Sequence, residues 1–145
     1  MIITQIEINA SPEIVRRVLL DFPAISEWHN GLIKSITPHD LNDPLGIGKK
    51  LHCIMEGFEF DSVVTENTPN KFVWQGPPIM TVSGLHTFLI EPSKTNPGGT
   101  TFTQIEEYSG SIAFLMQDWL LGRSIKGQFE KYNGDLKKKC EEVRN

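Results

Sequence analysis

The sequence predicts an α+β domain in which a curved antiparallel sheet of about seven strands lies against one long C-terminal helix. Two observations predict this class: a series of strand-like segments with short turns between most of them, and a single long helical pattern at the end of the chain. Segments joined by short turns pair as antiparallel neighbours, and the apolar face of such a sheet needs a covering layer. The chain of 145 residues has the length of one domain, which we expect to span residues 1–145.

The covering layer is predicted from the last part of the chain, Gly110 to Val143. Apolar residues recur there at steps of three, four or seven, which places them on one face of a helix. These residues are Phe114, Leu121, Ile125, Phe129, Tyr132, Leu136, Cys140 and Val143. Ser111 is the expected N-cap, because its hydroxyl can accept a free N–H of the first turn.

The first strand is predicted at Ile2 to Asn9, where isoleucines alternate with other residues. Ser11 and Pro12 then begin a helix that Pro23 ends, and a second short helix is expected around Ala24 to Trp28. Six further strands are predicted at 32–38, 49–55, 58–66, 71–75, 81–91 and 100–109.

Composition excludes several classes of function. The net charge of −4 and the pI near 5.5 argue against nucleic acid as a main partner. The thiols Cys53 and Cys140 lack the spacing of a zinc site, and His29, His39 and His52 stand in unrelated contexts, so we expect no metal and no cofactor. The N-terminus does not read as a signal peptide and no stretch has the length of a membrane span, which favours the cytoplasm.

Four stretches, taken in order, are similar to a known superfamily. They are ASPEIVRRVLLDFPAISEWH (Ala10 to His29), NKFVWQGPP (Asn70 to Pro78), GLHTFLIEP (Gly84 to Pro92) and GGTTFTQIEEYSG (Gly98 to Gly110), the last leading into the long helix. Together they resemble the START/Bet v 1-like (SRPBCC) superfamily, of the polyketide cyclase/dehydrase and lipid transport type. The resemblance implies a helix-grip fold with a deep apolar cavity under the C-terminal helix. It does not fix a function, because one fold hosts many unrelated functions.

The resemblance also implies which residues line the cavity, with the facing of each taken from strand alternation or helical spacing. On the sheet, the expected ligand-binding residues are Phe60, Phe72, Trp74, His86, Phe88, Gln104, Glu106 and Tyr108. On the helix, they are Phe114, Asp118, Leu121 and Ile125. A β-bulge would reverse the facing of any strand residue.

Two of these residues are candidates for catalysis. His86 lies near Gln104 or Glu106 if the sixth and seventh strands pair, and a buried histidine beside a carboxylate can exchange protons near neutral pH. The simpler interpretation is a hydrogen-bonded interior histidine that only orients a ligand or the sheet. Asp118 interrupts an apolar stripe, and it either opens the cavity or binds a backbone N–H.

Three functions remain open at this point. The leading one is binding or transport of a small hydrophobic ligand, such as a lipid, a sterol or an aromatic, polyketide-like molecule. The second is a cyclase or dehydratase acting on an aromatic or polyketide substrate. The third is a partner-binding protein with a vestigial cavity. A homodimer contact is an alternative use of the apolar residues off the main helical stripe, which are Ile112, Met116, Trp119 and Leu120.

Overall fold

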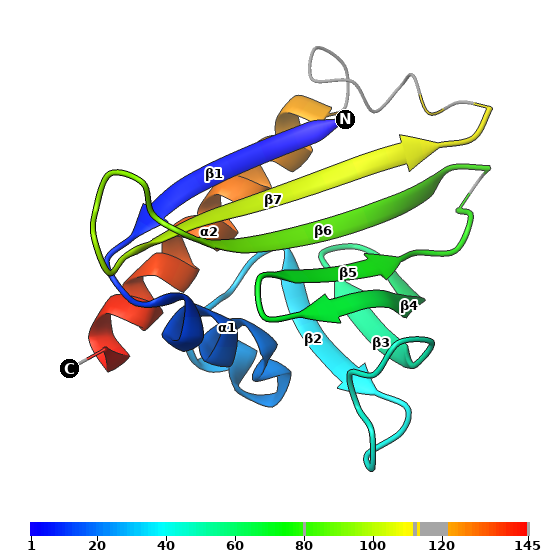
Figure 1. Ribbon diagram of the computed structural model, residues 1–145. Coiled ribbons are helices and arrows are strands. Elements are labelled where there is room, and N and C mark those ends of the chain that lie inside the picture. The colour runs from blue at the N-terminus through cyan, green and yellow to red at the C-terminus, as the bar shows by residue number, and fades with distance from the viewer. Residues whose placement is uncertain (80, 112, 114–121, 145) are drawn as a thin grey trace.

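One antiparallel sheet organises the molecule (Figure 1). The structure is a computed structural model and describes residues 1–79, 81–111, 113 and 122–144. Within these residues, the strand order is β1-β7-β6-β5-β4-β3-β2. The strands are β1 (Ile2–Ile8), β2 (Ile33–Pro38), β3 (Lys50–Met55), β4 (Glu59–Thr68), β5 (Lys71–Gln75), β6 (Ser83–Pro92) and β7 (Thr100–Ser109). Each corresponds to a segment predicted from alternation, so the predicted sheet is confirmed.

Two short helices follow β1, as predicted. Helix α1 (Pro12–Leu20) begins after Ser11, whose Oγ accepts a hydrogen bond of 3.3 Å from the N–H of Ile14. Pro12 occupies the first helical turn, where a missing N–H costs nothing. The second is the 3-10 helix η1 (Phe22–Glu27). These helices lead the chain from one end of the sheet to β2, at the opposite edge from β1.

The C-terminal helix α2 is described from Arg123 to Val143. Gly122, which precedes it, also has helical dihedrals, with φ −63° and ψ −27°. The first part of the predicted helix includes residues 112 and 114–121, which lie outside the described residues. Ser111 itself lies in a turn, and its hydroxyl is 2.9 Å from Oγ1 of Thr81. The first turn that it was expected to cap includes residues 112 and 114, which lie outside the described residues, so this cap stays a prediction.

Helix α2 lies across one face of the sheet, behind β1 and β7 in the view of Figure 1. Its buried residues are Phe129, Tyr132, Asn133, Leu136 and Cys140. All but Asn133 belong to the predicted apolar stripe. Burial of a large apolar side chain contributes roughly 1.5–3 kcal/mol, so this face of α2 is a major source of its attachment to the sheet.

A buried histidine also attaches α2 to the segment before β2. His29 Nδ1 donates to Oδ2 of Asp135 on α2 at 2.8 Å, and its Nε2 accepts from the N–H of Ile33 at 3.3 Å. Burial lowers the pKa of His29, although the hydrogen bond to Asp135 acts in the opposite direction. The ring is thus held neutral between two elements.

Among the described residues, no helix is both long and apolar enough to cross a lipid bilayer.

Candidate functional site

A cavity of about 470 Å³ lies between the sheet and α2. This volume falls within the range of roughly 300–1,000 Å³ that is typical of small-molecule sites. Six of the residues expected from the sequence line it: Phe60, Trp74, His86, Glu106, Tyr108 and Ile125. Alternation identified the five strand residues among these, and helical spacing identified Ile125.

The other expected residues do not line the cavity in the described part of the chain. Phe72, Phe88 and Gln104 are buried behind the lining, where they contact Trp74 or His86. Phe114, Asp118 and Leu121 lie outside the described residues. The residues of the expected homodimer contact, Ile112, Met116, Trp119 and Leu120, lie outside them as well.

Ten lining residues were not singled out as binding residues from the sequence. They are Leu32, Met55, Phe58, Gly76, Pro77, Ile79, Val82, Gly84, Gln128 and Phe129. One of them carried a signal in the sequence, because Phe129 belongs to the predicted helical stripe. The residues at the rim of the cavity carried none, because their positions depend on how loops fold over the sheet.

The polar end of the cavity is formed by His86 and Glu106. These residues are directly opposite each other on β6 and β7, so their side chains leave the sheet on the same face. Nδ1 of His86 lies 2.8 Å from Oε2 of Glu106, and the two side chains are 4% and 12% exposed. A buried carboxylate is costly without a partner, and His86 is that partner here.

A chain of hydrogen bonds holds the other side of the His86 ring. Its Nε2 lies 2.7 Å from Oε1 of Gln104. Gln104 Nε2 donates to Asn133 Oδ1 on α2 at 2.6 Å, and Asn133 Nδ2 donates to Oγ1 of Thr4 on β1 at 2.9 Å. Four elements therefore contribute to one buried polar network, and Gln104, Asn133 and Thr4 are almost completely buried.

This chain determines where the protons of His86 lie. Because Gln104 uses its amide N–H to bind Asn133, its carbonyl oxygen faces His86 and accepts a hydrogen bond from the N–H at Nε2. The second ring nitrogen, Nδ1, faces Glu106, and both residues belong to the cavity lining.

The contact between His86 and Glu106 is close but not a well-aligned hydrogen bond. Oε2 of Glu106 is buried and has no hydrogen-bond partner among the described residues, despite its distance of 2.8 Å from Nδ1. The other oxygen, Oε1, sits over Gly84, where an added Cβ would overlap it. The absence of a side chain at Gly84 therefore gives the carboxylate its position.

Tyr108 lies on the same side of the cavity, two residues beyond Glu106 on β7. Burial raises the pKa of its hydroxyl, and the nearby charge of Glu106 raises it further. Tyr108 thus remains a neutral hydrogen-bonding group at physiological pH.

Aromatic rings surround His86. Phe88 stacks on it with a centroid distance of 4.3 Å and an interplanar angle of 15°. Trp74 and Phe129 approach it at 5.3 and 5.1 Å. These rings exclude water from the imidazole and make the nearby wall of the cavity apolar.

Two loops contact each other at the rim of the cavity. Ile79 and Val82 form a small turn through reciprocal backbone hydrogen bonds, and Ile79 is 46% exposed. Beside this turn, Thr81 bonds Ser111 through their hydroxyls, and Gly110 adopts a φ of 120°. A Cβ at residue 110 would overlap the carbonyl oxygen of Thr81. Only glycine fits this close approach.

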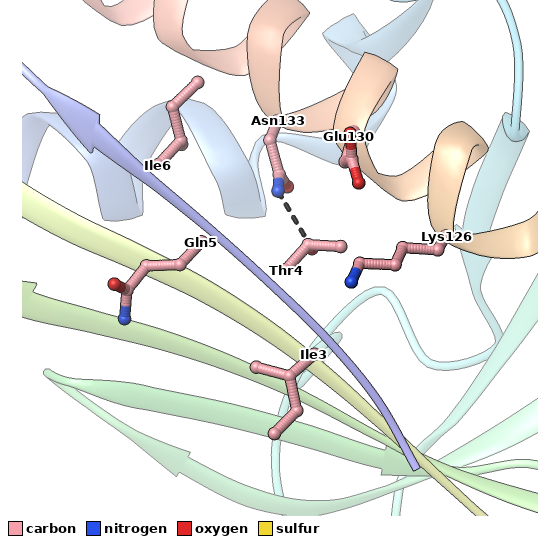
Figure 2. Close-up of a pocket in the computed structure, with 7 residues that line it drawn as sticks. All are labelled: Ile3, Thr4, Gln5, Ile6, Lys126, Glu130 and Asn133. Carbon is pink, nitrogen blue, oxygen red and sulfur yellow. Dashed lines mark hydrogen bonds between the residues drawn. The ribbon is translucent and has the colours of Figure 1, made fainter. Parts of the chain in front are cut away.

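A second pocket lies where β1 meets α2, and Figure 2 draws its lining. Asn133 points from α2 toward Thr4, with Lys126 and Glu130 on the preceding turns of the helix (Figure 2). The hydrogen-bond chain of His86 therefore ends at the wall of this pocket, while its other end reaches the apolar cavity.

Comparisons with known proteins agree with this architecture. A family model described as "Polyketide cyclase / dehydrase and lipid transport" matches residues 2–141. Among curated proteins, no sequence matches the chain.

Several solved structures share the fold. A START superfamily protein from Mycobacterium smegmatis is 18% identical, covers 98% of this chain and 97% of its own, and has a TM-score of 0.71. A norcoclaurine synthase from Thalictrum flavum is 14% identical, with coverages of 99% and 95% and a TM-score of 0.73. A protein from Thermus thermophilus is 13% identical, with coverages of 99% and 99% and a TM-score of 0.74. At these identities the likeness concerns the fold, and it confirms the expected helix-grip architecture.

Proposed function

The chain belongs to the polyketide cyclase/dehydrase and lipid transport family, and we propose on that premise that its cavity binds a small, mainly apolar molecule with one polar group. The observation that carries this proposal is the pairing of apolar walls with a polar end at His86 and Glu106. The ligand classes are those expected from the sequence: a lipid, a sterol or an aromatic, polyketide-like molecule. The apolar part of such a ligand occupies the cavity, and its polar group meets the His86–Glu106 pair.

Burial of apolar surface supplies the affinity. At ~25 cal/mol per Å², a ligand that buries about 200 Å² of apolar surface gains roughly 5 kcal/mol before the costs of association. The carboxyl group of Glu106, the imidazole of His86 and the hydroxyl of Tyr108 are the polar groups that this cavity offers to a hydroxyl or carbonyl group. These polar contacts orient the ligand and discriminate against molecules that lack the group, because the buried polar atoms would then stay unpaired.

A cavity-filling substitution tests the proposal. Ile125 is a half-buried wall residue, so Ile125→Trp places a large ring in the cavity. Ile47 is 70% exposed on the loop before β3, and Ile47→Trp is the matched control. We expect an environment-sensitive apolar dye to bind the unaltered protein and the Ile47→Trp variant, with at least tenfold weaker binding to Ile125→Trp. Equal binding to all three proteins, or none to the unaltered protein, contradicts the proposal.

The natural ligand requires a different measurement. Native mass spectrometry of the tag-free protein, purified from its own cells, should reveal a retained apolar molecule. The same measurement on Ile125→Trp is the control, and we expect it to lack the added mass.

A second candidate function is catalysis by the same pair. It is favoured by the 2.8 Å approach of His86 to Glu106 beside an apolar cavity, an arrangement that suits general acid–base chemistry. Norcoclaurine synthase, a structural neighbour, is described in complex with dopamine and hydroxybenzaldehyde. If the pair is catalytic, Glu106→Gln should retain binding of an aromatic substrate and lose turnover. Unchanged turnover in Glu106→Gln and in His86→Asn would remove this candidate.

The setting of the protein is part of the proposal. We expect a cytoplasmic protein that does not bind nucleic acid, consistent with its net charge of −4. Cell fractionation tests the location, and a filter-binding assay with DNA and RNA tests the second expectation. The homodimer expected through Trp119 and its neighbours is tested by light scattering on the unaltered protein and on Trp119→Ala. A mass that equals one chain in both proteins contradicts it.

A further inference from the structure

A cluster of potential metal ligands lies outside the cavity, on strands β2 to β4. His52 on β3 is directly opposite Asp61 on β4. His39 follows the last residue of β2, and its backbone N–H binds the carbonyl oxygen of Lys50 at 3.0 Å. The neighbours of His52 along β3 are Leu51 and Cys53, both completely buried, so His52 projects from the opposite, outer face of the sheet.

The sequence places these histidines in unrelated contexts, and the structure brings two of them to the same carboxylate. His39 Nε2 lies 3.2 Å from Oδ1 of Asp61, and His52 Nδ1 lies 2.8 Å from the same oxygen. One donor atom from each of the three side chains lies within 4.8 Å of the others. Tetrahedral zinc with bonds of ~2.0–2.1 Å requires ligand atoms roughly 3.3 Å apart, so small movements bring these atoms to that spacing.

A fourth side chain orients one of the ligands. Oε2 of Glu59 lies 2.9 Å from Nε2 of His52. When this carboxylate accepts a hydrogen bond from the N–H at Nε2, Nδ1 carries no proton, and its lone pair faces Asp61 and His39. In established metal sites, a ligating histidine almost always donates its second ring N–H to a carboxylate, a carbonyl or water in this way. The cluster therefore has three candidate ligands, and Glu59 is a further residue that orients one of them.

We propose that His39, His52 and Asp61 bind a divalent transition metal of the zinc class, with Glu59 orienting His52. Two imidazole nitrogens and one carboxylate oxygen form a donor set suited to such ions.

The bound metal would add a cross-link between three strands that already pair as neighbours in the sheet. β2 is the edge strand of the sheet, and the 39–49 segment that follows it has no regular secondary structure. Exposed ion pairs of these side chains contribute only about 0–1 kcal/mol. A metal bridge between β2, β3 and β4 would stabilise the folded state in proportion to the metal concentration.

Calorimetric titration of the tag-free protein with zinc chloride tests this proposal. We expect one bound ion per chain, with affinity at least 100-fold lower in His52→Ala and in Asp61→Asn. Glu59→Gln should weaken binding about 10- to 100-fold, because it removes only the orienting group. Asp40→Asn is the matched control, since Asp40 is a partly exposed carboxylate near the cluster that pairs with Lys49, and it should bind zinc as the unaltered protein does.

Cobalt provides a second readout on the same proteins. Visible absorption of Co²⁺ typical of a tetrahedral nitrogen and oxygen site should appear with the unaltered protein and with Asp40→Asn, and should be lost in His39→Ala and His52→Ala. Absence of binding to the unaltered protein, or affinities that are unchanged in His39→Ala, His52→Ala and Asp61→Asn, would overturn the proposal. Neither readout depends on the cavity, so failure here leaves the proposed function untouched.

Discussion

The carboxylate of Glu106 occupies the space over Gly84 that a side chain would otherwise fill. The two residues lie on neighbouring strands, and Gly84 is also part of the cavity lining. The position of the charged group at the polar end therefore depends on a missing Cβ. This relationship makes the geometry of the His86–Glu106 pair sensitive to a single methyl group.

Gly84→Ala should move the carboxylate away from His86. We expect ligand binding to weaken about tenfold, which corresponds to the loss of roughly one charge-assisted hydrogen bond. The imidazole nitrogen shifts of His86, measured by NMR without ligand, should also change. Gly127→Ala is the control, because Gly127 is not part of the cavity lining and an added Cβ there meets nothing within 4 Å. Unaltered His86 shifts in Gly84→Ala would contradict this account.

Asn133→Leu should destabilise the protein through the hydrogen-bond chain. The substitution leaves Gln104 Nε2 and the hydroxyl of Thr4 without their partner. Each buried group without a partner costs about 1–3 kcal/mol, so urea unfolding should show a loss of roughly 2–5 kcal/mol. The tautomer of His86 should become mixed, because Gln104 is free to turn. Gln5→Leu removes a comparable amide–hydroxyl bond to Thr103, but Gln5 is exposed, and we expect a change within about 0.5 kcal/mol.

The buried His29 predicts a specific loss of stability in acid. Burial lowers the pKa of His29. Below about pH 6.5 its imidazole is therefore protonated in the unfolded chain while it stays neutral in the folded chain. The stabilising contribution is complete above that pH and declines as the pH falls toward the folded pKa, by up to about 1.4 kcal/mol per pH unit. His29→Gln should be less stable at pH 7.5 but should lose less stability between pH 7.5 and 5. Equal losses in the two proteins, measured by urea unfolding, would refute this.

Both thiols should be unreactive in the folded protein. Burial raises the pKa of Cys53 to about 11 and that of Cys140 to about 12, and both side chains are completely buried. Thiolate is the reactive form, so a disulfide reagent at pH 8 should label neither cysteine until denaturant is added. Rapid labelling of one thiol in the native state would show that its burial is incomplete in solution.

Alternation along strands was sufficient to predict most of the sheet side of the site. His86 and Glu106 were expected on one face of neighbouring strands, and their register confirms it, because β6 and β7 pair along their whole length without a bulge. Helical spacing likewise identified Ile125. Strand alternation and helical spacing depend only on local backbone geometry, so both can be recognised in the sequence alone.

The remaining features depend on contacts between distant segments. Gly84 looks like an ordinary strand glycine until the side chain of Glu106 is placed over it. The partnership of Gln104 with Asn133 requires a particular rotation of α2 on the sheet. His39, His52 and Asp61 converge only because β2, β3 and β4 are neighbours in a particular register. No periodicity in the chain encodes these relationships.

The two loops at the rim of the cavity are joined to each other. Thr81 is bonded to Ser111, and the backbone of Gly110 packs against the Thr81 carbonyl without room for any side chain. These two contacts tie the segments to each other at the rim. Under the proposed function, we expect that cutting the Thr81–Ser111 link would speed both binding and release of the ligand while leaving its Kd nearly unchanged.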